Sequence, residues 1–136
     1  MFNTKEELVK YIIQQFQYCD SLGCLDSSSS TPVYSHLQSS NKIGCAIGCI
    51  LDDDEADKLQ NYCNKVDIYR ISELLHYDKN VTDNIPVALS LVENYINFDN
   101  ISFQDLQDIQ EIHDNCVLCK KSVQSFIVRL QEEYNV

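Results

Sequence analysis

The chain has 136 residues, of which 44% are hydrophobic and 23% charged. This length and balance predict one globular domain, residues 1–136, and exclude a disordered chain. The net charge of −11 repels nucleic acid phosphates, so we expect no direct nucleic acid contact and favour a protein or small-ligand partner. No apolar run approaches the roughly 20 residues needed to cross a bilayer, and the N-terminus lacks a signal-peptide pattern. We therefore expect a soluble, cytoplasmic protein without membrane contact.

The predicted organising centre is residues 44–51, Gly-Cys-Ala-Ile-Gly-Cys-Ile-Leu. Its side chains are small or apolar and uncharged, which is typical of a buried segment that other elements pack against closely. The acidic run from Asp52 to Glu55 predicts the start of a helix, because carboxylates cap the N-terminus and suit the positive end of the helix dipole. Periodicity leaves residues 33–50 open between a short β-hairpin and a buried helical turn.

Three helices are predicted in the N-terminal half of the chain. Thr4 and Glu7 have the spacing of a capping box, and Gly23 is the predicted C-terminal stop of this first helix. A second helix is predicted over 53–66 and a shorter one over 68–76. The apolar faces are predicted to be Leu8, Val9, Ile12, Ile13, Phe16 and Cys19, then Ala56, Leu59, Cys63 and Val66, then Ile71, Leu74 and Leu75.

Further helices are predicted in the C-terminal half. Pro86, after a polar linker at 77–84, fits the first turn of one of them. Ser102 and Asp105 resemble a weak capping box that opens the next, and Asn115-Cys116 interrupts its apolar pattern. The apolar faces are predicted to be Ala88, Leu91, Val92, Tyr95 and Ile96, then Phe103, Leu106, Ile109 and His113, then Cys119, Val123, Phe126, Ile127, Leu130 and Tyr134. The expected fold is mainly α (α+β at most), a compact single domain of about five to six helices with the hairpin as the open alternative.

Two short motifs carry a resemblance to a known group of proteins. The first stands here as Cys45-Ala46-Ile47-Gly48-Cys49-Ile50-Leu51, and the second as Ile109-Gln110-Glu111-Ile112-His113-Asp114. With Tyr34 upstream, they resemble the Cys-Ala-(Val/Ile)-Gly-(Cys/Ala)-Leu-Ile and Leu-Gln-x-Ile-His-Asp motifs of uncharacterised small proteins of phages, prophages and bacteria. The chain departs from that group in having Asp52 where its members carry Pro, and in having no Trp to open the last helix. The resemblance implies a phage or mobile-element origin and no mechanism.

Seven cysteines are present, and without an export pattern we expect reduced thiols, many of them buried. Two spacings among them also suit zinc, namely Cys-x3-Cys in the first motif and His-x2-Cys-x2-Cys after the second. The metal ligands of this alternative are Cys45, Cys49, His113, Cys116 and Cys119. We favour free thiols without a cofactor over this zinc site.

The pair His113-Asp114 resembles the metal-binding pair of phosphohydrolases, but only His36 and His76 remain as further histidine ligands. We favour His113 as a core-edge imidazole that hydrogen-bonds a backbone carbonyl or the region of Tyr34, joining the last two helices to residues 44–51. Nucleophilic catalysis needs an oriented base beside a Ser or Cys, and the sequence has no such signature.

These observations favour a small non-enzymatic accessory protein of a phage or mobile element that acts by binding inside the bacterial host. It would inhibit a host process such as antiphage defence, by blocking a basic host protein or by sequestering a nucleotide-type signal in a pocket, with a homo-oligomer as one arrangement. The alternatives are a zinc- or His-Asp-dependent hydrolase and a structural or regulatory accessory protein. The candidate ligand-binding residues are Tyr34, Arg70, His113 and Asp114, with Lys120, Lys121 and Arg129 as further cations for phosphates.

Overall fold

The computed structural model describes residues 1–24, 32–80 and 87–136. This part of the chain contains six α-helices and one 3-10 turn, η1, so the predicted mainly helical class is confirmed. Its β-structure is limited to two isolated bridges, Phe2 with Ile96 and Cys24 with Pro32. The elements are α1 (Lys5–Phe16), η1 (Gly48–Ile50), α2 (Asp53–Val66), α3 (Ile71–Asn80), α4 (Val87–Glu93), α5 (Phe103–Leu118) and α6 (Val123–Tyr134).

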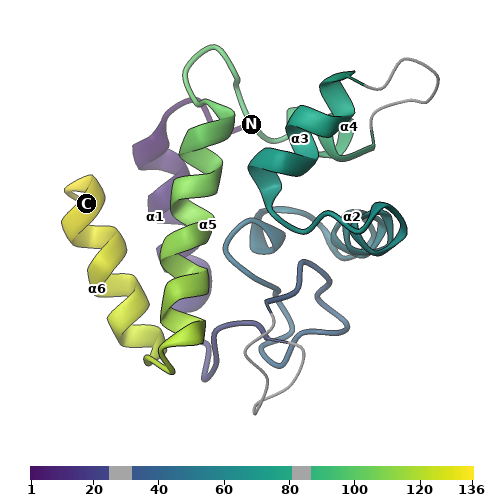
Figure 1. Cartoon of the computed structure of the whole chain (residues 1–136). Helices are drawn as coiled ribbons and strands as arrows, with labels where there is room; N and C mark the ends of the chain where they lie inside the picture. The colour runs from purple at the N-terminus through teal and green to yellow at the C-terminus, as the bar shows by residue number, and fades with distance from the viewer. Residues whose placement is uncertain (25–31, 81–86) are drawn as a thin grey trace.

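The helices form two groups that share α5 (Figure 1). On one side α6 packs against both α1 and α5, and on the other α4 packs against both α2 and α3. Helix α5 also packs against α3, and η1 contacts α1. Because α5 contacts both groups, its side chains reach residues 44–51 (the central segment), the start of the chain and α6.

Helix α1 begins as predicted and ends earlier than predicted. The Thr4 hydroxyl accepts the Glu7 N–H at 3.2 Å, while the Glu7 carboxylate accepts the Asn3 N–H at 3.0 Å. The predicted stop at Gly23 is wrong, because the helix ends at Phe16. Gly23 instead has φ +80, and a Cβ there would lie 2.1 Å from the Gly44 carbonyl oxygen. This glycine therefore allows close approach to the central segment rather than ending a helix.

Helix α2 matches its predicted bounds, 53–66. The Asp52 carboxylate accepts the Glu55 N–H at 2.8 Å, and Asp67 ends the helix in the left-handed conformation with φ 57. Helix α3 continues to Asn80, so the first residues of the predicted polar linker at 77–84 are helical. The remainder of that linker and Pro86 lie outside the described residues.

Helix α5 passes through the predicted interruption at Asn115-Cys116 and ends at Leu118. Burial of Cys116 and Val117 explains the difference, since packing overrides the modest helix propensity of Asn and Cys. The capping box at its start is complete, with hydrogen bonds of 3.0 and 2.8 Å between Ser102 and Asp105. Cys119, predicted for the apolar face of α6, is exposed and lies at the end of α5.

The predicted core faces are largely confirmed. Most of their members are at most 6% exposed, including all those predicted in α3. The predicted core residues that are only half-buried are Ile13, Cys19, Val66, Leu91, Tyr95, Phe103, Val123 and Tyr134. Across the described ranges, no helix combines the length and apolar character required to span a bilayer.

Candidate functional site

Residues 44–51 are buried, as predicted, with Ala46 and Ile47 completely inaccessible. Of the two structures left open, the buried helical turn is the one found, because Gly48–Ile50 forms a 3-10 turn and residues 33–50 contain no strand. Gly44 and Gly48 lie against the backbone of Tyr34, where an added Cβ would be 2.5 Å from its carbonyl oxygen in each case. The small side chains therefore permit direct contact between two backbone segments.

His113 is completely buried between Phe16 and Phe126, with ring centroids 5.7 and 5.3 Å away. Its Nε2 donates a hydrogen bond to the backbone carbonyl of Leu22, and its Nδ1 lies 3.1 Å from an Asp114 carboxylate oxygen. The predicted contact between this imidazole and a backbone carbonyl is confirmed. The contact joins α5 to the segment that follows α1, so the predicted connection of His113 to residues 44–51 is wrong.

Gln110, one helical turn before His113, makes the direct contact between α5 and the central segment. Its Oε1 accepts the Ile47 N–H at 3.0 Å, and its Nε2 donates to Asp114 at 2.7 Å. Asp114 thus links the two α5 side chains that hold the core backbone. The second sequence motif has a structural role in the described molecule, although Gln110 was not singled out from the sequence.

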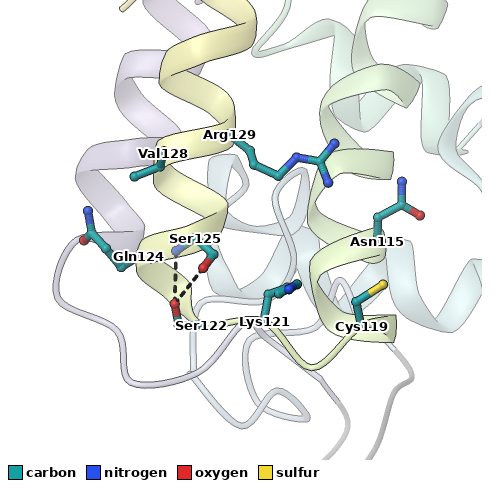
Figure 2. Close-up of a pocket in the computed structure, with 8 residues that line it drawn as sticks. All are labelled: Asn115, Cys119, Lys121, Ser122, Gln124, Ser125, Val128 and Arg129. Atoms are coloured by element: carbon teal, nitrogen blue, oxygen red, sulfur yellow. Dashed lines mark hydrogen bonds between the residues drawn. The ribbon is translucent and has the colours of Figure 1, made fainter.

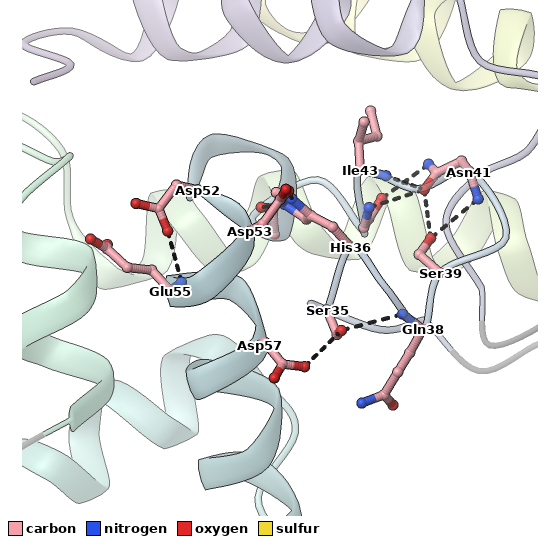
Figure 3. A network of polar contacts seen from close by, with 12 residues as sticks. Ser35, His36, Gln38, Ser39, Asn41, Ile43, Asp52, Asp53, Glu55 and Asp57 are labelled. Carbon is pink, nitrogen blue, oxygen red and sulfur yellow. Dashed lines mark hydrogen bonds and ion pairs between the residues drawn. The ribbon is translucent and has the colours of Figure 1, made fainter.

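The loop before the central segment is tied to α2 (Figure 3). His36 is 8% exposed, and its Nε2 donates to the Gly48 carbonyl at 2.7 Å while its Nδ1 lies 2.6 Å from an Asp53 oxygen. One residue earlier, the Ser35 hydroxyl donates to Asp57 at 3.1 Å. The acidic start of α2 therefore fixes this loop as well as capping the helix.

Burial keeps the central thiols in their neutral form. It raises the pKa of Cys45 to about 12, with a further contribution from Asp114, and it raises the pKa of Cys49 well above its usual value. The Cys49 thiol also donates to the Ala46 carbonyl at 3.0 Å.

The five candidate metal ligands are not brought together. Within the described ranges, no group of three or more His, Cys, Asp or Glu side chains is placed to hold a metal ion. Cys45 and Cys49 lie in the central segment, whereas Cys116 and Cys119 lie in the last turn and at the end of α5. The Nε2 of His113 is engaged by the Leu22 carbonyl. The geometry therefore offers the zinc alternative no support.

The remaining candidate ligand residues also have partners within the chain. Tyr34 is buried, which raises its pKa well above 10, and its hydroxyl donates to the Tyr69 carbonyl at 2.6 Å. Arg70 is exposed and pairs with Glu73, at 3.6 Å, and with Glu111. None of the four candidates lines the pocket described next.

An open pocket of about 420 Å³ lies between the end of α5 and the start of α6 (Figure 2). In Figure 2, Arg129 extends from α6 toward α5, and Lys121 lies in the short connection between the two helices. The pocket is lined by Asn115, Cys119, Lys121, Ser122, Gln124, Ser125, Val128 and Arg129. These side chains include two cations, four hydroxyl or amide groups and one exposed thiol.

The pocket is lined by two cations and no carboxylate, in a protein whose net charge is −11. Neither Lys121 nor Arg129 forms an ion pair with a carboxylate in the described part of the chain. Ser122 caps α6 by accepting the Ser125 N–H at 3.1 Å, and the first turn of α6 carries no acidic residue. Cationic side chains and a helix N-terminus both favour an anion.

Sequence reasoning found part of this pocket. It named Lys121 and Arg129 as cations for phosphates together with Lys120, which does not line the pocket. It missed Asn115 and Ser122, because the predicted interruption at Asn115-Cys116 obscured the end of α5 and the packing angle of α6 against α5 is not set by the sequence pattern. The run Lys-Lys-Ser immediately before an apolar helix was the available indication.

Comparison of the chain with protein-family models, curated proteins and solved structures finds no match. The fold and the site define a mainly helical, acidic protein with a pocket at the α5–α6 corner that is lined by two cations.

Proposed function

We propose that this protein acts by binding, and that the α5–α6 pocket holds a small anionic ligand of the nucleotide type. The observation that carries the proposal is the placement of Lys121 and Arg129 in one pocket without a described carboxylate partner. Arginine and lysine are the side chains that recognise phosphate most often, by charge-assisted hydrogen bonds. The cavity volume of about 420 Å³ falls in the range of small-molecule sites.

The lining of the pocket favours binding over catalysis. It contains a thiol and two hydroxyl groups, and it contains no histidine or carboxylate that would act as a general base. The most conspicuous candidate base, His113, is buried and donates to the Leu22 carbonyl. A hydrolase built on His113 and Asp114 therefore has less support than a binding site.

The resemblance to small phage and prophage proteins suggests what such binding would achieve. A phage protein that holds a nucleotide-type signal lowers its free concentration in the host, and this would blunt an antiphage defence that depends on that signal. The biological part of the proposal rests on the resemblance, whereas the chemical part rests on the pocket.

Thermal unfolding with a defined panel of compounds tests the chemical part. The panel contains adenosine, AMP, ATP and inorganic phosphate, each added to the full chain at low ionic strength. A ligand that binds the folded state at 100 times its Kd stabilises it by about 2.7 kcal/mol, which raises Tm measurably. We expect a rise with the phosphorylated compounds, no rise with adenosine, and a smaller effect at high salt because screening weakens charge contacts.

The matched variants are Lys121→Gln and Arg129→Gln in the pocket and Lys58→Gln, an exposed lysine on α2, as the control. Each pocket variant should lose most of the ligand-induced rise, and the control should keep it. The proposal is overturned if no phosphorylated compound raises Tm, or if the pocket variants respond as strongly as the control.

A further inference from the structure

Two cysteines lie one helical turn apart beside the same pocket. Cys116 is in the last turn of α5 and 1% exposed, and Cys119 follows at the end of the helix and lines the pocket. Cys119 is also the one exposed thiol among the seven, all of which are described. The proposed binding function makes no use of this Cys-x-x-Cys pair.

The spacing of the pair is close to what a disulfide needs. Residues three apart on a helix have Cβ atoms about 5–6 Å apart, and a disulfide needs about 3.5–4.5 Å. Cys119 has left helical geometry, with φ −86 and ψ 6, and the next residue, Lys120, has φ 54. Closure therefore requires a small movement at a helix end, where the Cys119 side chain is exposed and holds no place in the core.

Two cations, Lys121 and Arg129, lie near the pair. Burial raises the pKa of the Cys116 thiol, and Arg129 and Lys121 both act to lower it. These charges offset the negative end of the α5 dipole, which disfavours a thiolate at this position. A cationic environment also attracts a reagent that carries carboxylates.

We propose that Cys116 and Cys119 form a redox-active dithiol, which closes to a disulfide by exchange with a small anionic disulfide such as oxidised glutathione. The pocket cations, Lys121 and Arg129, bind the carboxylates of the reagent, and exposed Cys119 reacts first. Buried Cys116 is the second nucleophile.

The exchange balances in two steps. The Cys119 thiolate attacks one sulfur of oxidised glutathione, forms a mixed disulfide and releases one glutathione thiolate. The Cys116 thiolate then attacks the Cys119 sulfur, forms the intramolecular disulfide and releases the second glutathione thiolate. The two released thiolates take up the two protons that the cysteines lost, and the two electrons reduce the reagent.

The other cysteines provide internal comparisons. Cys19 is half-buried, its thiol donates to the Gln15 carbonyl at 3.5 Å, and burial with nearby Asp20 raises its pKa. The other four are buried. An anionic disulfide therefore meets one accessible thiol in a cationic setting and one half-buried thiol beside a carboxylate.

Disulfide closure would change the shape of the pocket, because Cys119 lines it. If the pocket holds an anionic ligand, closure makes that binding dependent on redox state. This regulatory consequence rests on the proposed function, whereas the thiol chemistry does not.

The full chain is treated with oxidised glutathione and then denatured. The thiols that remain are alkylated in the denatured state, and the mass of the protein is measured. The wild type should lose two alkylatable thiols and carry no glutathione. Cys116→Ala should stop at one glutathione on Cys119, and Cys119→Ser should react at neither position. Cys19→Ser should behave as the wild type. Circular dichroism of each variant establishes that it is folded, and Cys116→Ser serves if the alanine variant is not.

The proposal is overturned if folded Cys119→Ser still loses two alkylatable thiols or takes up glutathione at Cys116, or if folded Cys116 variants acquire no glutathione. It is also overturned if the wild type retains the mixed disulfide without closing.

Replacing the reagent with cystamine, a cationic disulfide, should slow the first step roughly fivefold, and Lys121→Gln should reduce that difference. Because the readout is covalent, its failure is separate from a failure to bind nucleotides.

Discussion

The central segment, residues 44–51, and the α5–α6 pocket differ in whether their polar groups have partners within the chain. Around the central segment, backbone groups are paired within the chain, as between Ile47 and Gln110 and between Gly48 and His36. In the pocket, Lys121 and Arg129 have no carboxylate partner in the described residues. Satisfied buried groups stabilise a fold, whereas unpaired surface cations are available to a ligand. The motif that is most conspicuous in the sequence thus makes structural contacts, and the proposed ligand site lies in a stretch without a recognisable motif.

The largest effect is expected from filling the space at Gly48. In Gly48→Ala the new Cβ would lie 2.5 Å from the Tyr34 carbonyl oxygen and 2.9 Å from its Cα, so backbone must move. We expect a loss of about 3 kcal/mol in the free energy of unfolding, measured by urea denaturation. Lys58→Ala, at an exposed site on α2, should change it by less than about 0.5 kcal/mol. Equal stabilities for the two variants would show that residues 44–51 are not closely packed.

The next effect is expected at His113. His113→Leu removes the donor to the Leu22 carbonyl and leaves a buried acceptor unsatisfied, at a cost of about 2 kcal/mol. His113→Gln keeps an N–H donor and should recover part of that loss. Chemical denaturation of both variants makes the comparison, and a leucine variant as stable as the wild type would refute the structural role of the imidazole.

Alkaline pH should destabilise the central segment through Cys45. Its thiol pKa is about 12 in the folded chain against 9.0 as the ordinary value, so the unfolded chain loses this proton first as pH rises. The stabilisation is complete below pH 9 and falls by about 1.4 kcal/mol per pH unit until the folded-state value is reached. Urea titrations at pH 8 and pH 10 should show a smaller loss in Cys45→Ala than in the wild type. An unchanged pH dependence in that variant would contradict the assignment.

The smallest effect is expected in the pocket. Lys121→Gln should change the free energy of unfolding by less than about 0.5 kcal/mol, because an exposed cation without a carboxylate partner contributes little to folding. The same substitution should abolish most of the nucleotide-induced rise in Tm. A strongly destabilised Lys121→Gln would make the pocket a structural feature and remove its contrast with the central segment.

The sequence predicted the helices more accurately than it predicted which segments contact one another. Capping residues and apolar spacing predicted α2 within its bounds and the start of α5 at Ser102, because these depend on neighbours within one turn. The end of α1 was wrong because Gly23 is required for contact with Gly44, which is distant in the sequence. The interruption at Asn115-Cys116 was wrong because burial outweighs local propensity there.

The same limit applies to the candidate site. The contact of His113 with a backbone carbonyl was predictable from an isolated imidazole on an apolar face, but its partner, Leu22, was not. The cations of the pocket were named, yet their neighbours Asn115 and Cys119 depend on how α5 meets α6. Such contacts are determined by how the helices pack against one another, and the hydrophobic periodicity of the sequence does not specify them.

The hydrogen bonds between Ile47 and Gln110 and between Leu22 and His113 join residues 63 and 91 positions apart in the chain. The ribosome synthesises the central segment before α5, so during synthesis residues 44–51 lack the α5 side chains that they contact in the folded protein. A nascent chain halted before α5 would therefore expose an uncharged apolar surface. Such surfaces bind chaperones and promote aggregation. The buried segment therefore reaches its native contacts only after α5 has been synthesised.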